Sequence, residues 1–361
     1  MPETKIRTPP PEPFFAISPE RFLQRAKAPA RLLHITNGSI AADVLRESGV
    51  PGRVTITADV LHEGPTPAGL PPERWRKVRA RYLAESGYGG YDECLASLTE
   101  WDHDLEEHRS VDEMVLWFEH DLFDQLLLIR TLDVLASRDL GLTRLSLICI
   151  GEHPEVQPFH GLGQLTPEQM AALLPTRQTV TREQIVLARH AWRSFCAAEP
   201  IGVEVAIRRD TSALPFLAGA LHRHLEEFPS LHGGLARTER QALAALAAAG
   251  GALSFDDLFH AAQDMEERRF LGDSSLLHRL QELSDDPRRL VRLEREPGGG
   301  PRAVRVILTS TGQDVLDGRD DWVRIHGIER WLGGVHLHGR EAQWRWDPMR
   351  DRLVPGALVV E

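Results

Sequence analysis

Short apolar runs alternate with amphipathic stretches over the first 160 residues, and this alternation restricts the fold more than any other feature. Four runs have the composition of strands, at 31–38, 53–58, 114–118 and 144–150. Apolar residues at helical spacing follow the first run at Ser39–Gly49 and the third run after Asp121. Strands that alternate with helices need crossover connections, which produce a mostly parallel sheet. Residues 31–160 are therefore predicted to form a Rossmann-like α/β domain.

The rest of the chain has a different pattern. Residues 161–232 carry helix signals, such as Thr166-Pro-Glu-Gln169 with proline at the first helical position, and are predicted to complete the N-terminal domain. Beyond them, three helices precede two alternating strands around a Gly- and Pro-rich turn at 296–301. This order indicates a winged-helix-like α+β domain over 233–361 with a Trp-rich C-terminal extension as an aromatic cover. Residues 1–30 are expected to be a Pro-rich, partly disordered tail.

Composition narrows the classes of partner. The 361 residues carry a formal net charge of -11, which argues against a surface that binds DNA or an anionic membrane throughout. The sequence lacks an uninterrupted apolar run of roughly 18 residues, and its first residues lack the apolar core of a signal peptide. The three cysteines are far apart, so neither a disulfide framework nor a zinc knuckle is predicted. A cytoplasmic protein that does not enter a membrane is expected.

Histidines and acidic residues recur where the predicted strands end. In an open α/β sheet the carboxyl edge of the strands forms the ligand-binding crevice, and polar groups are costly to bury without partners. We therefore expect these side chains to share one solvent-reachable pocket. The residues predicted to be catalytic are His62, Glu63, Glu119, His120 and Asp121. The residues predicted to bind the ligand are His34, Asn37, Ser39 and Asp59.

Three chemistries are compatible with such a pocket. His62 or His120 would act as the acid–base group or bind a divalent metal, with Glu63 and Glu119 as orienting or ligating carboxylates. Asn37 and Ser39, placed before a helix, would contact an anionic group of the substrate. The sequence contains neither a G-x-G-x-x-G fingerprint nor a Walker loop. The prediction is thus a pocket for a nucleotide or another small anion, with metal-assisted hydrolysis or transfer as one option and the cofactor left open.

Structural roles compete with each functional one. Asp121 stands where a helix cap is expected, and His34 lies inside an apolar run, as a hydrogen-bonded core histidine would. Asp59, His62 and Glu63 precede Gly64-Pro65 and could belong to a turn. The charged stretch 222–227 is interpreted as a solvated helix face. The case for a site depends on the repetition of these residue types at corresponding positions.

The second hypothesis is a regulatory or adaptor protein in which the winged-helix-like domain binds DNA or a protein. A recognition helix near 274–281 would enter the major groove, and Arg279, Arg288 and Arg289 would reach phosphates. Residues 236–361, however, hold 18 arginines, no lysine and 21 acidic residues, a formal charge of -3. A duplex-binding domain usually has a clear positive face, so this charge disfavours DNA and leaves a protein partner as the alternative.

Several segments together resemble a known family. They are His34-Ile-Thr-Asn-Gly38, 59–65, 117–121 with Asp124-Gln125, 161–165, 223–230, 234–240 and 270–273. In these segments the chain resembles the bacterial proteins catalogued as domain of unknown function 1835. The resemblance runs from about Leu32 to the Trp-rich end and implies that the segments form one architecture. It implies no particular reaction, and the first thirty residues lie outside it.

Overall fold

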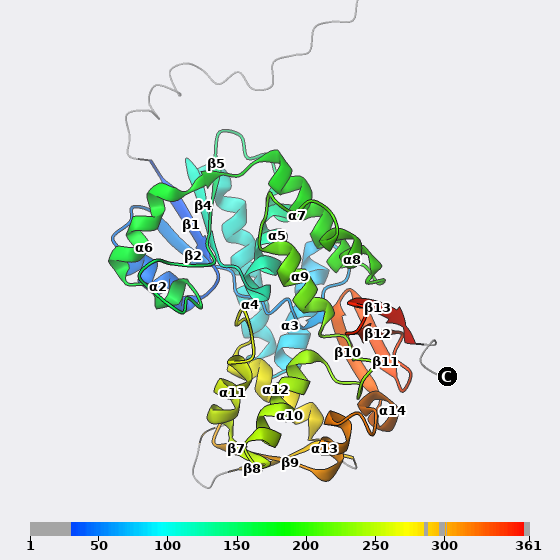
Figure 1. Cartoon of the computed structure of the whole chain (residues 1–361). Coiled ribbons are helices and arrows are strands. Elements are labelled where there is room, and N and C mark those ends of the chain that lie inside the picture. The colour runs from blue at the N-terminus through cyan, green and yellow to red at the C-terminus, as the bar shows by residue number, and fades with distance from the viewer. Residues whose placement is uncertain (1–29, 285–287, 296–299, 301, 357–361) are drawn as a thin grey trace, which may run out of the picture.

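The computed structural model describes residues 30–284, 288–295, 300 and 302–356 (Figure 1). The predicted tail, apart from Ala30, and most of the predicted turn at 296–301 lie outside the described residues. Within the described ranges, no helix is long and apolar enough to cross a membrane. The remaining residues form a mixed α/β structure with a mostly parallel main sheet, as predicted for the N-terminal part.

The main sheet contains all four predicted strands. In the order of the sheet these are β2 (Arg53–Ile56), β1 (Leu32–Thr36), β4 (Glu113–Phe118), β5 (Arg144–Cys149) and β6 (Gln178–Thr179). The first four are parallel, and the two-residue β6 pairs antiparallel at the edge. Because β1 lies between β2 and β4, the connections that leave β1 and β4 run in opposite directions, which makes their carboxyl ends a topological switch point.

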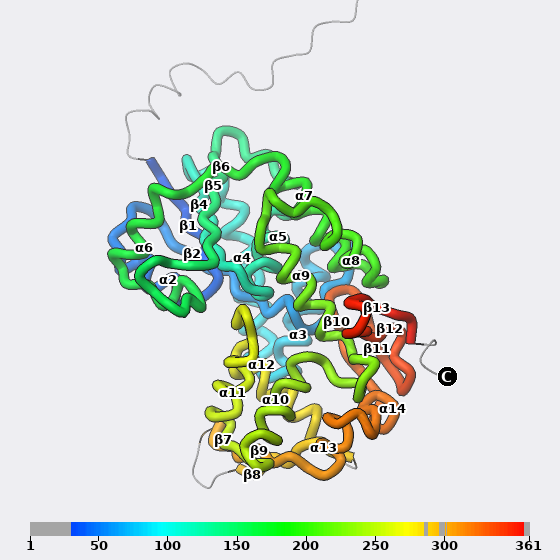
Figure 2. Tube along the Cα trace, viewed as in Figure 1, coloured from blue at the N-terminus to red at the C-terminus, as the bar shows by residue number. Residues whose placement is uncertain are grey.

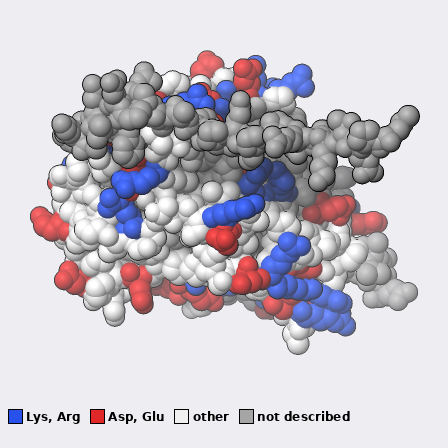
Figure 3. Space-filling view, turned by 90° about the horizontal axis from the view of Figure 1, so that it is seen from above, with Lys and Arg blue, Asp and Glu red and all other residues white. Residues whose placement is uncertain are grey.

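Helices cover both faces of this sheet, because alternate residues of its central strand are apolar on both sides. Val115 and Trp117 pack with α2 (Ser39–Glu47) and α6 (Pro167–Leu173) on one face. The other face packs against α5 (Leu122–Ala136), which contacts α7 (Arg182–Phe195) and α9 (Leu217–Leu225). The remaining helices of this half are α3 (Pro72–Glu85), α4 (Tyr91–Glu106) and α8 (Ile201–Ile207). Seen from above, the coloured side chains of this end show both charge signs interspersed (Figure 3).

The interpretation of the charged stretch 222–227 as a solvated helix face is wrong for three of its five charged or titratable residues. Arg223, His224 and Glu227 are buried, with 7%, 2% and 5% of their surface exposed. Arg223 forms ion pairs of 2.7 Å with both Glu227 and Glu266. The end of α9 is covered by the segment that begins α10 (Arg237–Ala248), so its charges face partners from elsewhere in the chain.

The predicted three helices and hairpin follow, with one additional strand. After α10 come β7 (Ala252–Ser254), α11 (Phe255–Gln263), α12 (Asp273–Leu283), β8 (Val291–Arg295) and β9 (Val304–Leu308). The strands form an antiparallel sheet in the order β7-β9-β8. These elements enclose a hydrophobic core of their own.

The Trp-rich end belongs to both halves of the molecule. It comprises α13 (Ser310–Leu316), α14 (Trp322–His326), β10 (Ile328–Gly333), β11 (Val335–Gly339), β12 (Trp344–Asp347) and β13 (Arg352–Pro355). Trp322 packs in the core of the C-terminal helices, whereas Leu332, Leu337 and Trp346 pack in the core of the main sheet. Strand β10 pairs in parallel with β3 (Gly64–Pro65), so the expected aromatic cover also completes the N-terminal half. The trace shows β10 to β13 beside α8 and α9 (Figure 2).

Candidate functional site

A hollow of about 480 Å³ lies at the switch point, beside the carboxyl ends of β1 and β4. Asn37–Ala41, at the start of α2, form one side of it, and Glu119 contributes from the end of β4. The third side is the segment ahead of α6, through His160, Gly161, Gly163 and Gln164. Of the predicted site residues, the structure brings Asn37, Ser39 and Glu119 to this hollow.

Gly161 and Gly163 allow the segment ahead of α6 to lie close to Glu119 and to the start of α2. A Cβ at Gly161 would stand 2.4 Å from Oε2 of Glu119, and one at Gly163 would stand 2.8 Å from Cγ2 of Ile40. Between them, the backbone N–H of Leu162 donates to Oε1 of Glu119 at 2.6 Å. A side chain at Gly161 would therefore displace the Glu119 carboxylate or this segment, whereas one at Gly163 would displace the exposed side chain of Ile40.

Glu119 also belongs to a cluster of three buried carboxylates. Glu119, Asp121 and Asp124 are 5%, 4% and 1% exposed, and one oxygen from each lies within 4.8 Å of the others. The side-chain amide of Asn37 donates to Glu119 at 3.0 Å and to Asp124 at 2.8 Å, so it bridges two members. Asp121 caps α5 and accepts from the N–H of Asp124 at 3.0 Å, as the capping interpretation predicts.

The electrostatics of the cluster favour a cation. Among the described residues, none of the three carboxylates forms an ion pair with an arginine, lysine or histidine. Burial and repulsion by Glu119 raise the pKa of Asp121 to about 8. Burial also raises the pKa of Glu119 and, with repulsion from both neighbours, that of Asp124. Three clustered carboxylate oxygens are the donor set that Mg²⁺ and Mn²⁺ prefer.

Asp124 was not among the predicted site residues. Its signal was present in the sequence, because Asp121 and Asp124 occupy the N-cap and the third position of α5. Side chains at these two positions both lie at the first turn, next to the end of β4. A capping aspartate followed three residues later by a second aspartate therefore indicated an acidic pair at the strand end.

The three predicted histidines do not share the hollow, and this part of the prediction is wrong. His34 is fully buried in the sheet, with Nε2 3.0 Å from the carbonyl of Pro51 and Nδ1 accepting from the indole N–H of Trp117 at 3.0 Å. His120 lies between Phe159 and Phe216, with ring centroids at 6.1 and 5.9 Å. Burial lowers the pKa of His120 to about 4, so the ring is neutral near pH 7.

The residues after β2 also lie apart from the hollow, because the chain turns away there to form β3 and pair with β10. Asp59 is fully engaged by Arg79, whose guanidinium donates to it at 2.6 and 3.1 Å. His62 is enclosed by the rings of Phe123 and Phe270. Asp59 and His62 therefore lie outside the lining of the hollow.

Glu63 joins the two halves of the protein. Its carboxylate accepts from the hydroxyl of Tyr88 and, at 2.6 Å, from the hydroxyl of Ser275 on α12. The same helix carries Arg279, which is 5% exposed and donates to Glu282 at 2.9 Å. Arg279 is thus unavailable to a phosphate in this arrangement, contrary to the expectation for a recognition helix, whereas Arg288 is exposed and Arg289 half-buried.

Comparison with known proteins adds no assignment. No family model matches the chain, and no curated protein is similar to it in sequence. The resemblance to domain of unknown function 1835 therefore stays an expectation, and the geometry of the site is what bears on function.

Proposed function

We propose that the hollow at the ends of β1 and β4 binds a nucleotide or another small phosphorylated molecule together with a divalent cation. The observation that carries this proposal is the double position of Glu119, which lines the hollow and belongs to the cluster of three buried carboxylates. A cation held by this cluster would lie where it can also bind an oxygen of an anion in the hollow.

The start of α2 supplies the anion-binding end. The first backbone N–H groups of a helix have no acceptor within the helix, and the helix dipole makes this end favourable for negative charge. Gly38 precedes α2 and contributes no side-chain cap, so the hollow gives a ligand direct access to these groups. Ser39 would add its hydroxyl, while Asn37 orients the carboxylates of Glu119 and Asp124.

The acidic cluster supplies the cation-binding end. Magnesium and manganese ions bind carboxylate and phosphate oxygens together, and a metal so placed polarises a phosphoryl oxygen or activates a bound water. Hydrolysis or transfer of a phosphoryl group is the reaction class that this combination supports. His120 is neutral and lies outside the lining of the hollow, so we assign it no catalytic role.

The substitution Asp121→Asn tests the cation site. Asparagine also caps helices well, so the variant keeps the cap of α5 and loses one of the three carboxyl groups that would bind the cation. We expect Mn²⁺ to raise the melting temperature of the wild-type protein, and ADP to raise it further in the presence of Mn²⁺. A ligand at a hundred times its Kd stabilises a protein by about 2.7 kcal/mol. The variant should lose this response and, without metal near pH 7, should be about as stable as the wild type, because a carboxyl whose pKa is about 8 is then mostly neutral, as asparagine is.

The matched control is Asp43→Asn, which makes the same chemical change on the exposed face of α2, where Asp43 pairs with Arg46. It should leave the response to Mn²⁺ unchanged. A wild-type protein whose melting temperature ignores Mn²⁺ and ADP, or an Asp121→Asn variant that responds as the wild type does, would contradict the proposal.

The winged-helix hypothesis has support of its own. The order helix, strand, two helices and hairpin, with the sheet order β7-β9-β8, supports this hypothesis. Yet α12, in the place of a recognition helix, is held against the N-terminal half through Ser275. We therefore propose that this unit acts as an internal partner of the α/β half, which favours an adaptor over a DNA-binding protein.

A further inference from the structure

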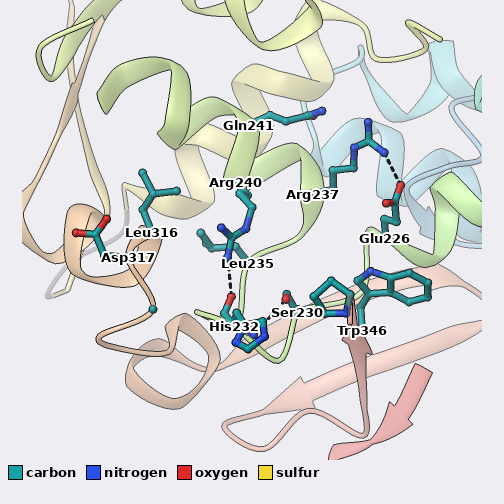
Figure 4. A pocket seen from close by; sticks show the side chains of 12 residues that line it. Glu226, Ser230, His232, Leu235, Arg237, Arg240, Gln241, Leu316, Asp317 and Trp346 are labelled. Carbon is teal, nitrogen blue, oxygen red and sulfur yellow. Dashed lines mark hydrogen bonds and ion pairs between the residues drawn. The ribbon is translucent and has the colours of Figure 1, made fainter. Parts of the chain in front are cut away.

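A second hollow, of about 680 Å³, lies between segments of the two halves and shares no lining residue with the first (Figure 4). It is formed by the segment between α9 and α10, by α10 itself, by the end of α13 and by β12. Its volume falls within the range of about 300 to 1,000 Å³ typical of small-molecule sites. Two of the segments that form it, 223–230 and 234–240, carry part of the resemblance described above and have no role in the first site.

Apolar side chains provide much of the wall. Leu235 and Trp346 are 1% and 5% exposed, and Leu316 and Pro348 add to the surface that faces the hollow. The indole of Trp346 stands edge-to-face against His222, at 5.5 Å between ring centroids. Leu235 and Trp346 are fixed by packing, so they would shield an apolar ligand from water without rearranging.

The charges around the hollow are paired, with one exception. Arg237 forms ion pairs with Glu226 at 2.8 Å and with Glu267 at 2.6 Å. Asp317 pairs with Arg319 at 2.7 Å. Arg240 donates only to the carbonyl of His232, at 3.1 Å, and makes no ion pair within the described part of the chain. Its guanidinium lies between Leu235 and His232 in the middle of the lining residues (Figure 4).

We propose that this second hollow binds a small organic carboxylate. An arginine side chain has five N–H donors in a planar fork that matches a carboxylate, and only one contact of Arg240 is taken by the protein. The apolar body of the ligand would lie against Leu235, Leu316 and Trp346. Glu226 and Asp317 lie on the same lining and disfavour a ligand of higher negative charge, because like charges at an interface are costly.

The probe pair that tests this is 3-phenylpropionate and its neutral amide, 3-phenylpropionamide, titrated into the full chain and followed by ligand-observed NMR. We expect the acid to bind the wild-type protein and the amide to bind at least ~10-fold more weakly, as the loss of a charge-assisted hydrogen bond implies. Arg240→Gln should weaken binding of the acid by a similar factor. Arg240→Lys should retain part of it, because lysine keeps the charge but not the fork.

The matched control is Arg193→Gln, which neutralises an exposed arginine on α7 and should leave binding unchanged. Leu316→Glu offers a second route, since a carboxylate on the wall should repel the acid more than the amide even if Arg240→Gln melts early. Equal binding of the acid and the amide, an undiminished affinity in folded Arg240→Gln, or no binding of either probe to the wild type would overturn the proposal.

Discussion

Glu227 joins the end of α9 to the start of α10, and Glu227→Gln is expected to destabilise the protein strongly. One carboxylate oxygen of Glu227 accepts from Nη1 of Arg223 at 2.7 Å and from the backbone N–H and hydroxyl of Thr238 at 3.2 and 2.6 Å. The residue is 5% exposed. Glutamine keeps the shape of the side chain but leaves Arg223 with Glu266 as its one acidic partner among the described residues.

The magnitude follows from the pKa. Burial by itself raises the pKa of Glu227, but the charges of Arg223 and Arg279 and the hydroxyl of Thr238 lower it to about 2. A glutamate in the unfolded chain has a pKa of about 4.3, and the difference of roughly two units corresponds to ~3 kcal/mol. This agrees with the 3–5 kcal/mol typical of breaking a buried ion pair. Because the folded-state pKa is the lower one, this stability is present above pH ~4 and is lost as the pH falls towards 2.

Urea unfolding of the wild type and of Glu227→Gln at several pH values measures this contribution. We expect a difference of about 3 kcal/mol that is constant from pH 7 to 5 and shrinks below pH ~4. Glu267→Gln is the control, because Glu267 pairs with Arg237 but is 75% exposed, and exposed pairs contribute less than about 1 kcal/mol. A loss below 1 kcal/mol for Glu227→Gln, or a difference that grows as the pH falls, would refute the reasoning.

Two further predictions concern the other proposals. Gly161→Ala should weaken the effect of Mn²⁺ and ADP on the melting temperature and should cost about 1–3 kcal/mol of stability, because its Cβ would collide with the Glu119 carboxylate. An unchanged effect of Mn²⁺ and ADP on the melting temperature would show that the segment at 160–164 is not part of the site. The full chain should leave duplex DNA unshifted in an electrophoretic mobility assay even at low salt, because α12 is held against the N-terminal half through Ser275. A shift that disappears in Arg288→Ala/Arg289→Ala would instead support the DNA-binding alternative.

The sequence predicted the main sheet because its strands are short, apolar and separated by helical patterns. Four of the five strands were found in this way, and the fifth, β6, has only two residues and no apolar run. The cap at Asp121 was also predictable, since the signal is local. Asn37, Ser39 and Glu119 lie at this sheet edge because each stands within three residues of the end of β1 or β4.

The failures share a different physical cause. The partners of His34 are Pro51 and Trp117, which lie 17 and 83 positions away, so neither the hydrogen bonds nor the burial of the ring follow from its neighbours in sequence. The buried charges at the end of α9 have the same origin, because Thr238 and Glu266 reach them from later elements. A run of charged residues looks identical in sequence whether water or a second layer of protein satisfies it.

The pairing of β3 with β10 has a consequence for how the protein is made. Gly64 and Pro65 align with Leu332 and Gly333, so the partner of β3 is translated 268 residues after β3 itself. Until that partner leaves the ribosome, β3 and the apolar surface that Leu332 and Leu337 later fill stay uncovered. Nascent chains, and fragments cut before β10, should for this reason be clients of chaperones and targets of proteases, and the two halves are best produced as one polypeptide.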